Sequence, residues 1–197
     1  PIPTEMLQHA HPVDIGNKHY ALLNNSSGNE RIYHYQLSTR NYEQALHEMN
    51  PNSPEYAKLC FRLAQIYHTG VPESYDPETD NKIAGIPPDT ERAITYYQIA
   101  IQYGYHSAIL DLANIFHWGN VGFKPNRDYA RHLYGAILKV GTPYEQGLAR
   151  DRLKQMQEEE GKVIGSISEG LDGADGVGNN FSSGSFASCL LYTSDAA

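Results

Sequence analysis

Two eight-residue segments of this chain are nearly the same, and this duplication constrains the fold more than any other feature of the sequence. Residues 63–70 read LAQIYHTG and residues 112–119 read LANIFHWG, so both fit the pattern L-A-x-I-[aromatic]-H-x-G. A match of this closeness indicates one structural unit that is used twice. The histidine that recurs in both copies raises the question of whether the unit also carries a functional site.

Each segment forms the end of a predicted helix. Ser53 followed by Pro54 is typical of an N-cap and a first helical position, and apolar residues then recur at helical spacing up to Gly70. A glycine directly after the last periodic residue commonly ends a helix. The same signals predict four further helices, over about residues 89–103, 105–118, 126–140 and 143–160.

The spacing between equivalent positions reveals an insertion. The two segments lie 49 residues apart, whereas Ala93 and Ala130, the matching alanines of the following helices, lie 37 residues apart. The first unit therefore carries about twelve additional residues, within the polar and acidic stretch 73–86, which is expected to form a surface loop. Without them each unit is a helix–turn–helix of 37 residues, and a period of this length is typical of a solenoid.

Small, aromatic and glycine residues occupy matching positions in both units. The first helices share Leu59, Leu63, Ala64, Tyr67 and Gly70, and Ala108, Leu112, Ala113, Phe116 and Gly119. The second helices share Ala93, Tyr96, Tyr97, Ala100, Ile101 and Gly104, and Ala130, Leu133, Tyr134, Ile137, Leu138 and Gly141. Over about residues 53–141 this pattern resembles the Sel-one-like repeat family, a branch of the tetratricopeptide-like superhelices.

The resemblance implies an all-α fold, a right-handed α-α superhelix (solenoid) of Sel-one-like or tetratricopeptide-like helix pairs. Small residues let paired helices approach closely, and large aromatic residues fill the space between neighbouring helices. The resemblance also implies a scaffold or adaptor in protein complexes, in which the concave groove binds a peptide or a partner protein. No cofactor is implied.

The flanks of the two clear units predict further helical structure. We expect a helical repeat domain over residues 30–160, with clear repeats at 53–141 and a capping helix at 143–160. Two short helices are expected before the repeats, at residues 30–37 and 42–49. The second is expected to end before Pro51, because proline interrupts a helix.

The two ends of the chain lack helical periodicity. Residues 1–29 are expected to be poorly ordered, and residues 161–188, rich in glycine and serine, to form a disordered tail, because they contain too few apolar residues to offset the entropy of ordering. Residues 189–197, CLLYTSDAA, resemble the translation of a common transposase sequencing adaptor and are expected to be a scar.

Register with tetratricopeptide units predicts which first-helix residues face the concave groove. They are Lys58, Gln65, His68, Thr69, Ser107, Asn114, His117 and Trp118. Neighbouring first helices pack about 10 Å apart, which suits a shared groove but is too wide for the two histidines to bind one metal ion. The histidines are therefore open to two interpretations, partner binding or a structural role. Trp118 likewise either faces the groove or packs on the following loop, near Val121 and Phe123.

No motif in the chain indicates catalysis or metal binding. C-x-x-C, H-E-x-x-H and G-x-S-x-G are all absent, and His9 and His11 have no further ligand nearby in the sequence. We therefore predict a non-enzymatic protein without a metal. Two alternatives stay open: a repeat fragment of a larger protein with a separate catalytic domain, and a hydrolase-like site built from the groove histidines.

Charge and composition narrow the choice of partners. The net charge of −8 disfavours nucleic-acid backbones as ligands, and no apolar stretch approaches the ~18–20 residues of a membrane span. If Cys189 belongs to the scar, Cys60 is the one remaining cysteine, which favours a reduced, intracellular (cytoplasmic) setting. The expected partner is a protein or peptide.

Overall fold

The structure is a computed structural model that describes residues 11–168, so the sequence-based expectations for residues 1–10 and 169–197 lie outside the described residues. The chain divides into two compact units, Pro1–Arg150 and Asp151–Ala197. The described part is mostly helical, which confirms the prediction of a helical protein. None of its helices combines the length and the apolar composition needed to cross a membrane.

The described elements are seven helices and two short strands. The helices are α1 (Pro12–Leu23), α2 (Gly28–Glu48), α3 (Pro54–Thr69), α4 (Thr90–Gln102), α5 (Ala108–Trp118), α6 (Arg127–Val140) and α7 (Pro143–Ser168). The strands β1 (Ser74–Tyr75) and β2 (Lys82–Ile83) pair in antiparallel fashion between α3 and α4.

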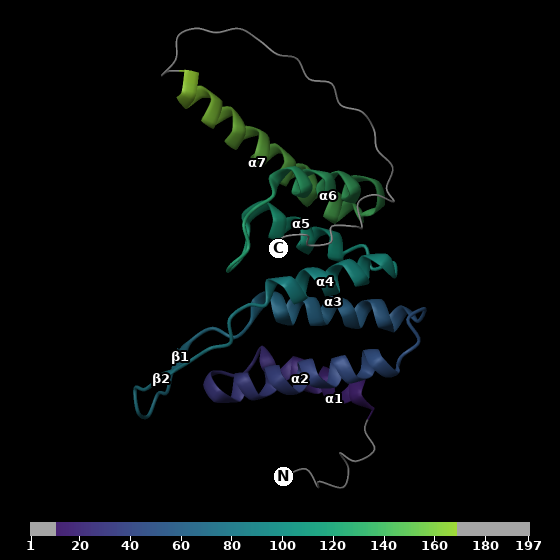
Figure 1. Ribbon diagram of the computed structural model, residues 1–197, viewed down its shortest axis with the longest axis vertical. Helices are drawn as coiled ribbons and strands as arrows, with labels where there is room; N and C mark the ends of the chain where they lie inside the picture. Colours follow the sequence, from purple (N-terminus) through teal and green to yellow (C-terminus); the bar gives the residue numbers. More distant parts are fainter. Residues whose placement is uncertain (1–10, 169–197) are drawn as a thin grey trace, which may run out of the picture. The chain divides into compact units, whose positions relative to one another are not determined.

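The first unit contains three helix pairs, α1 with α2, α3 with α4, and α5 with α6, which follow one another in Figure 1. Contacts between α2 and α3 and between α4 and α5 connect successive pairs. The side chains between the helices are those that the apolar pattern predicts: Leu63, Tyr97, Leu112 and Tyr134 are all at most 1% exposed.

The α3/α4 and α5/α6 pairs turn in the same way. Gly70 and Gly119 end the first helices with φ of 62° and 76°, and a Cβ on either would clash with the carbonyl oxygen of the returning loop. The N-cap residue of each second helix then donates its backbone N–H to a first-helix carbonyl. The bonds run from Asp89 to Tyr67 (2.8 Å) and from Asn126 to Phe116 (2.7 Å).

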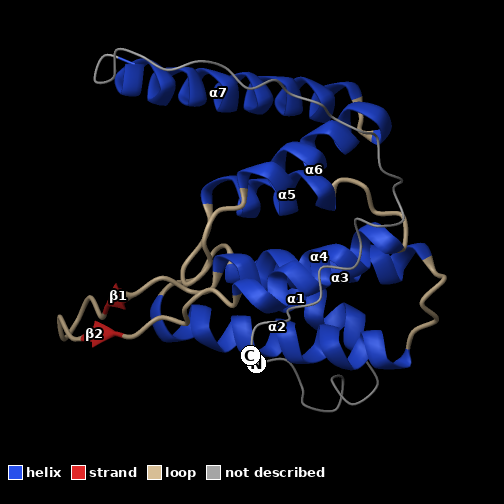
Figure 2. Cartoon of the chain, turned by 45° about the horizontal axis from the view of Figure 1, so that its top comes forward, coloured by secondary structure: helices blue, strands red, loops and turns tan. Residues whose placement is uncertain are grey.

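The predicted surface loop at 73–86 contains the β1–β2 hairpin, which projects beyond the ends of the helices (Figure 2). An isolated bridge between Val71 and Ile86 closes the base of this insertion. The shorter connector of the α5/α6 pair is closed by an equivalent bridge between Asn120 and Phe123. The two connectors thus differ in length and share the geometry of their base.

Two predictions for the N-terminal region are wrong. Residues 12–23 form helix α1, where we expected a poorly ordered segment, and residues 28–48 form one helix instead of two short ones. The α1 helix is held by packing: the ring of Tyr42 lies on Gly16, where any side chain would overlap it. The Tyr42 hydroxyl also donates to Asn17 Oδ1 (2.9 Å).

The predicted end of the last helix is also wrong. Helix α7 begins at Pro143 as expected but continues to Ser168, past the boundary at residue 160. Gly161 lies inside the helix and does not end it. A glycine lowers helix stability by only about 1 kcal/mol and, unlike a proline, it keeps its backbone N–H. The remainder of the predicted tail, residues 169–188, and the predicted scar at 189–197 lie outside the described residues.

Candidate functional site

The recurring histidine makes the same contact in both helix pairs. His68 Nδ1 lies 3.4 Å from the hydroxyl of Tyr97, and His117 Nδ1 lies 3.2 Å from the hydroxyl of Tyr134. Each contact joins the end of a first helix to the second helix of the same pair. This shared contact explains the recurrence of the histidine by packing alone.

The two histidines differ in their exposure and in the residue that follows each of them. Trp118 stacks on the ring of His117, with ring centroids 4.2 Å apart, and His117 is 1% exposed. The equivalent residue beside His68 is Thr69, and His68 stays half-buried. The prediction that His117 faces an open groove is therefore wrong, because its side chain is buried.

Three of the eight predicted groove residues line one cavity. Gln65, His68 and Thr69 contribute to a cavity of about 280 Å³, which we call the groove pocket. Lys58 and Ser107 are exposed and do not line it.

Asn114 and Trp118 also lie outside the groove pocket. Asn114 accepts a hydrogen bond from the Tyr134 hydroxyl (2.8 Å), so its carbonyl group faces its own helix pair. Trp118 is 45% exposed, and its indole lies on His117. In the loop that follows, Phe123 packs on Phe116.

The groove pocket lies where the first helices of all three pairs meet. The Tyr20 hydroxyl of α1 donates to Gln65 Oε1 of α3 (3.3 Å), and Gln65 Nε2 donates to Asp111 Oδ2 of α5 (3.5 Å). Tyr97 of α4 also donates to Asp111 Oδ2, at 3.5 Å. The cavity is therefore lined by polar groups that are already oriented by one another.

Burial shifts the protonation of the acid and the base in this pocket. Desolvation raises the pKa of Asp111, although the hydrogen bond from Gln65, the charge of His68 and the hydrogen bond from Tyr97 act in the opposite direction. Desolvation lowers the pKa of His68, and the nearby charge of Asp111 offsets part of that shift. Burial therefore favours the neutral form of both side chains relative to water, and shifts of this kind are common at functional sites.

Arg31 of α2 contributes a positive charge to the wall of the groove pocket. Its Nε atom is buried, and within residues 11–161 the guanidinium forms no hydrogen bond or ion pair. A buried donor that is left unsatisfied costs free energy, so an incoming acceptor would be favoured here.

Sequence patterns did not predict Tyr20, Arg31 or Asp111. The one available signal is the acidic residue inside the apolar run AILDLANIF.

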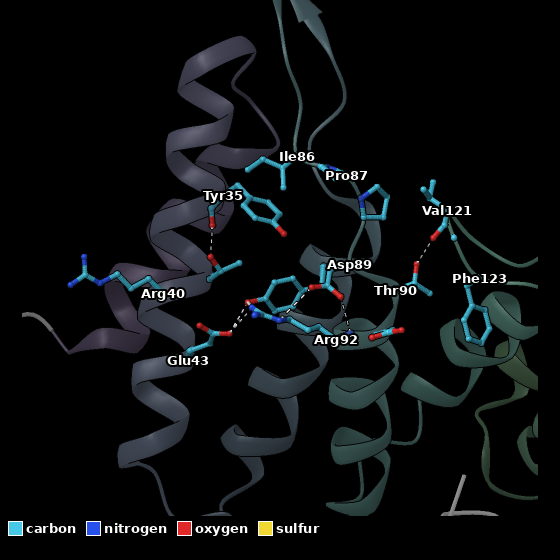
Figure 3. Close-up of a pocket in the computed structure, with 15 residues that line it drawn as sticks. Tyr35, Arg40, Glu43, Ile86, Pro87, Asp89, Thr90, Arg92, Val121 and Phe123 are labelled. Carbon is cyan, nitrogen blue, oxygen red and sulfur yellow. Dashed lines mark hydrogen bonds and ion pairs between the residues drawn. The ribbon is translucent and has the colours of Figure 1, made fainter. Parts of the chain in front are cut away.

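A second cavity, of about 690 Å³, lies on another part of the first unit and is drawn in Figure 3. We call it the loop-side pocket. Helix α2, the start of α4 and the loops at 86–89 and 121–123 form its walls.

A network of polar groups joins the helices on one side of the loop-side pocket. Glu43 Oε1 accepts from the Tyr67 hydroxyl (2.6 Å), and Arg92 Nη1 donates to the same hydroxyl (3.1 Å). Arg92 also pairs with Asp89 (3.3 Å) and lies over the ring of Tyr67, 5.3 Å from its centroid. The network holds the α2, α3 and α4 side chains in fixed positions around the cavity.

Comparisons with protein-family models, curated proteins and solved structures found no match for this chain. Within residues 11–168 no group of three or more His, Cys, Asp or Glu side chains is arranged to hold a metal ion.

Proposed function

We propose that this protein is a scaffold or adaptor of the Sel-one-like, tetratricopeptide-like class, and that it binds a peptide or partner protein on the face formed by α1, α3 and α5. One observation carries the proposal: Tyr20, Gln65 and Asp111, from three successive first helices, form a continuous row of hydrogen bonds along one cavity. In a right-handed superhelix of helix pairs this face is the concave one.

The size and chemistry of the groove pocket support a peptide as the ligand. A volume of about 280 Å³ suits one side chain of a longer segment better than a whole small molecule, because small-molecule pockets span about 300–1,000 Å³. Donors and acceptors from different helices line it, and Thr69 at its edge is exposed. Preformed polar groups of this kind fix the orientation of a bound segment.

The hydrolase-like alternative requires the two recurring histidines in one site. His68 contacts Tyr97 and His117 contacts Tyr134, so each histidine belongs to its own helix pair. One histidine beside one buried carboxyl group, without an activated nucleophile, favours a binding site over a hydrolytic one.

Selection from a displayed peptide library tests the proposal, with Thr69→Arg as the blocking variant and Thr95→Arg as the matched control. Both threonines are exposed and donate to the carbonyl oxygen four residues earlier at 2.9 Å, but Thr95 does not line the groove pocket. We expect peptides selected on the wild type to bind Thr69→Arg at least about tenfold more weakly, the effect of 1.4 kcal/mol, and Thr95→Arg unchanged. Equal binding to both variants would exclude the groove pocket.

A further inference from the structure

The loop-side pocket is faced by the hydroxyl group of Tyr35, a tyrosine whose ring is largely buried. Tyr35 is 6% exposed, and its hydroxyl points into the cavity toward Asp89 (Figure 3). Within residues 11–161 the Tyr35 hydroxyl forms no hydrogen bond. This hydroxyl is open to the cavity and its hydrogen-bonding capacity is unused by the described residues, so it can donate to or accept from a group that enters.

The charges around the loop-side pocket are predominantly negative. Glu43, Asp89 and Glu91 all line it. Of its two arginines, Arg92 pairs with Asp89 (3.3 Å) and Glu43 (3.8 Å), which leaves Glu91 without an ion pair among the described residues, and Arg40 extends away from the cavity in Figure 3. A cationic group that enters the cavity would therefore meet carboxylates whose charge is only partly compensated.

We propose that the loop-side pocket binds the lysine or arginine side chain of a basic partner segment, with its nitrogen donating to the Tyr35 hydroxyl and pairing with the surrounding carboxylates. This site lies apart from the groove pocket and does not depend on the function proposed for it.

The walls of the cavity suit the rest of such a side chain. The Tyr35 and Tyr67 rings meet edge to face, with centroids 6.4 Å apart, and Pro87 and Phe123 add apolar surface. The aliphatic part of a lysine or arginine packs well on surface of this kind. Arg92, which lies over the Tyr67 ring, shows that these walls already accommodate a guanidinium.

The charge of the whole chain favours a basic protein segment as the source of the cation. The cavity, at about 690 Å³, has room for a lysine or arginine side chain. The whole chain carries a net charge of −8, which attracts a basic partner over a longer range.

Two-dimensional NMR of the ¹⁵N-labelled full chain tests this site with three blocked tripeptides, Gly-X-Gly, in which X is arginine, lysine or citrulline. We expect the arginine and lysine peptides to shift the amide signals of residues 35–43 and 86–92, and citrulline, the neutral analogue of arginine, to leave them unchanged. Binding should weaken several-fold between about 50 and 500 mM salt, because partly exposed ion pairs are screened.

Tyr35→Phe removes the hydroxyl and keeps the ring, and Tyr33→Phe is the matched control, because Tyr33 is on the same helix, 55% exposed, and does not line the cavity. Loss of one hydrogen bond should weaken binding about three- to tenfold in Tyr35→Phe and leave Tyr33→Phe unchanged.

If neither charged peptide shifts these signals at concentrations up to ~10 mM, the proposal is overturned, because even a weak, millimolar ligand would bind at that concentration. Equal binding of the citrulline peptide or of the Tyr35→Phe variant would overturn it as well. Spermidine that binds more tightly than both charged peptides would show that the site takes a free amine and not a protein side chain.

Discussion

The α3/α4 and α5/α6 pairs contain the same histidine–tyrosine contact in two different surroundings. In α3/α4 the histidine borders a polar cavity beside Asp111, whereas in α5/α6 it is buried and its ring stacks on Trp118. Both pairs need the contact for packing, and only one leaves it accessible to a ligand. A residue that recurs with a repeat therefore marks a shared packing role, and functional candidates are better sought among the residues that differ.

The largest expected difference between the pairs is in stability. His117→Ala should lower the free energy of unfolding by about 3 kcal/mol, because it leaves a cavity in a closed core, whereas His68→Ala should cost about 1 kcal/mol at its half-buried position. Urea unfolding monitored by circular dichroism measures both. Equal losses would show that the difference in burial between the two histidines has no energetic consequence.

The turns should be equally sensitive in the two pairs. Gly70→Ala and Gly119→Ala each place a side chain at positive φ and against a backbone carbonyl, and each should cost about 2 kcal/mol or more. Gly122→Ala is a useful control, since Gly122 also has positive φ but an added Cβ there would meet no other atom within 4 Å. If Gly122→Ala lowers the free energy of unfolding as much as the other two variants do, the whole loss of stability comes from the positive φ and none from the clash with the carbonyl oxygen.

The buried carboxyl group distinguishes the α3/α4 surroundings. The pKa of Asp111 is raised in the folded state, so folding favours its protonated form, and the stability gained from protonation is lost as pH rises through the folded pKa. Asp111→Asn should therefore stabilise the protein at pH 7, on the order of 1 kcal/mol, and this gain should vanish below about pH 3. Thermal unfolding across this pH range gives the difference, and a destabilised variant at pH 7 would contradict it.

The smallest expected effect is in the titration of His68. Its pKa is lowered in the folded state, so the unfolded chain binds more protons below about pH 6.5, and this histidine contributes less stability as the pH falls through that window. Since the charge of Asp111 raises the pKa of His68, Asp111→Asn should lower it further. Histidine ring NMR signals report this directly, and an unchanged or higher pKa would contradict the assigned coupling.

Helices α3 to α6 and the start of α7 could be predicted because glycine and proline mark their ends and apolar residues recur within them, whereas Gly161 gave the wrong end for α7. The helix α1 could not, since its N-cap is a histidine and Gly16 lies inside it; only the Tyr42 ring, a long-range contact, explains that glycine. Gln65, His68 and Thr69, which the register with tetratricopeptide units assigns to one face of a helix, all line the groove pocket. Asp111 and Arg31 join them through tertiary packing, which no local pattern reports.

The common base of the two connectors has a consequence for engineering. Residues 71–88 and 120–125 close on the same bond between an N-cap amide and a first-helix carbonyl, although one carries a projecting hairpin and the other does not. The interior of the longer connector can thus be replaced without a change to the base that joins it to the helices. Exchange of its tip for a foreign loop, with Val71 and Ile86 retained, would display new sequence from a scaffold whose helices keep their register.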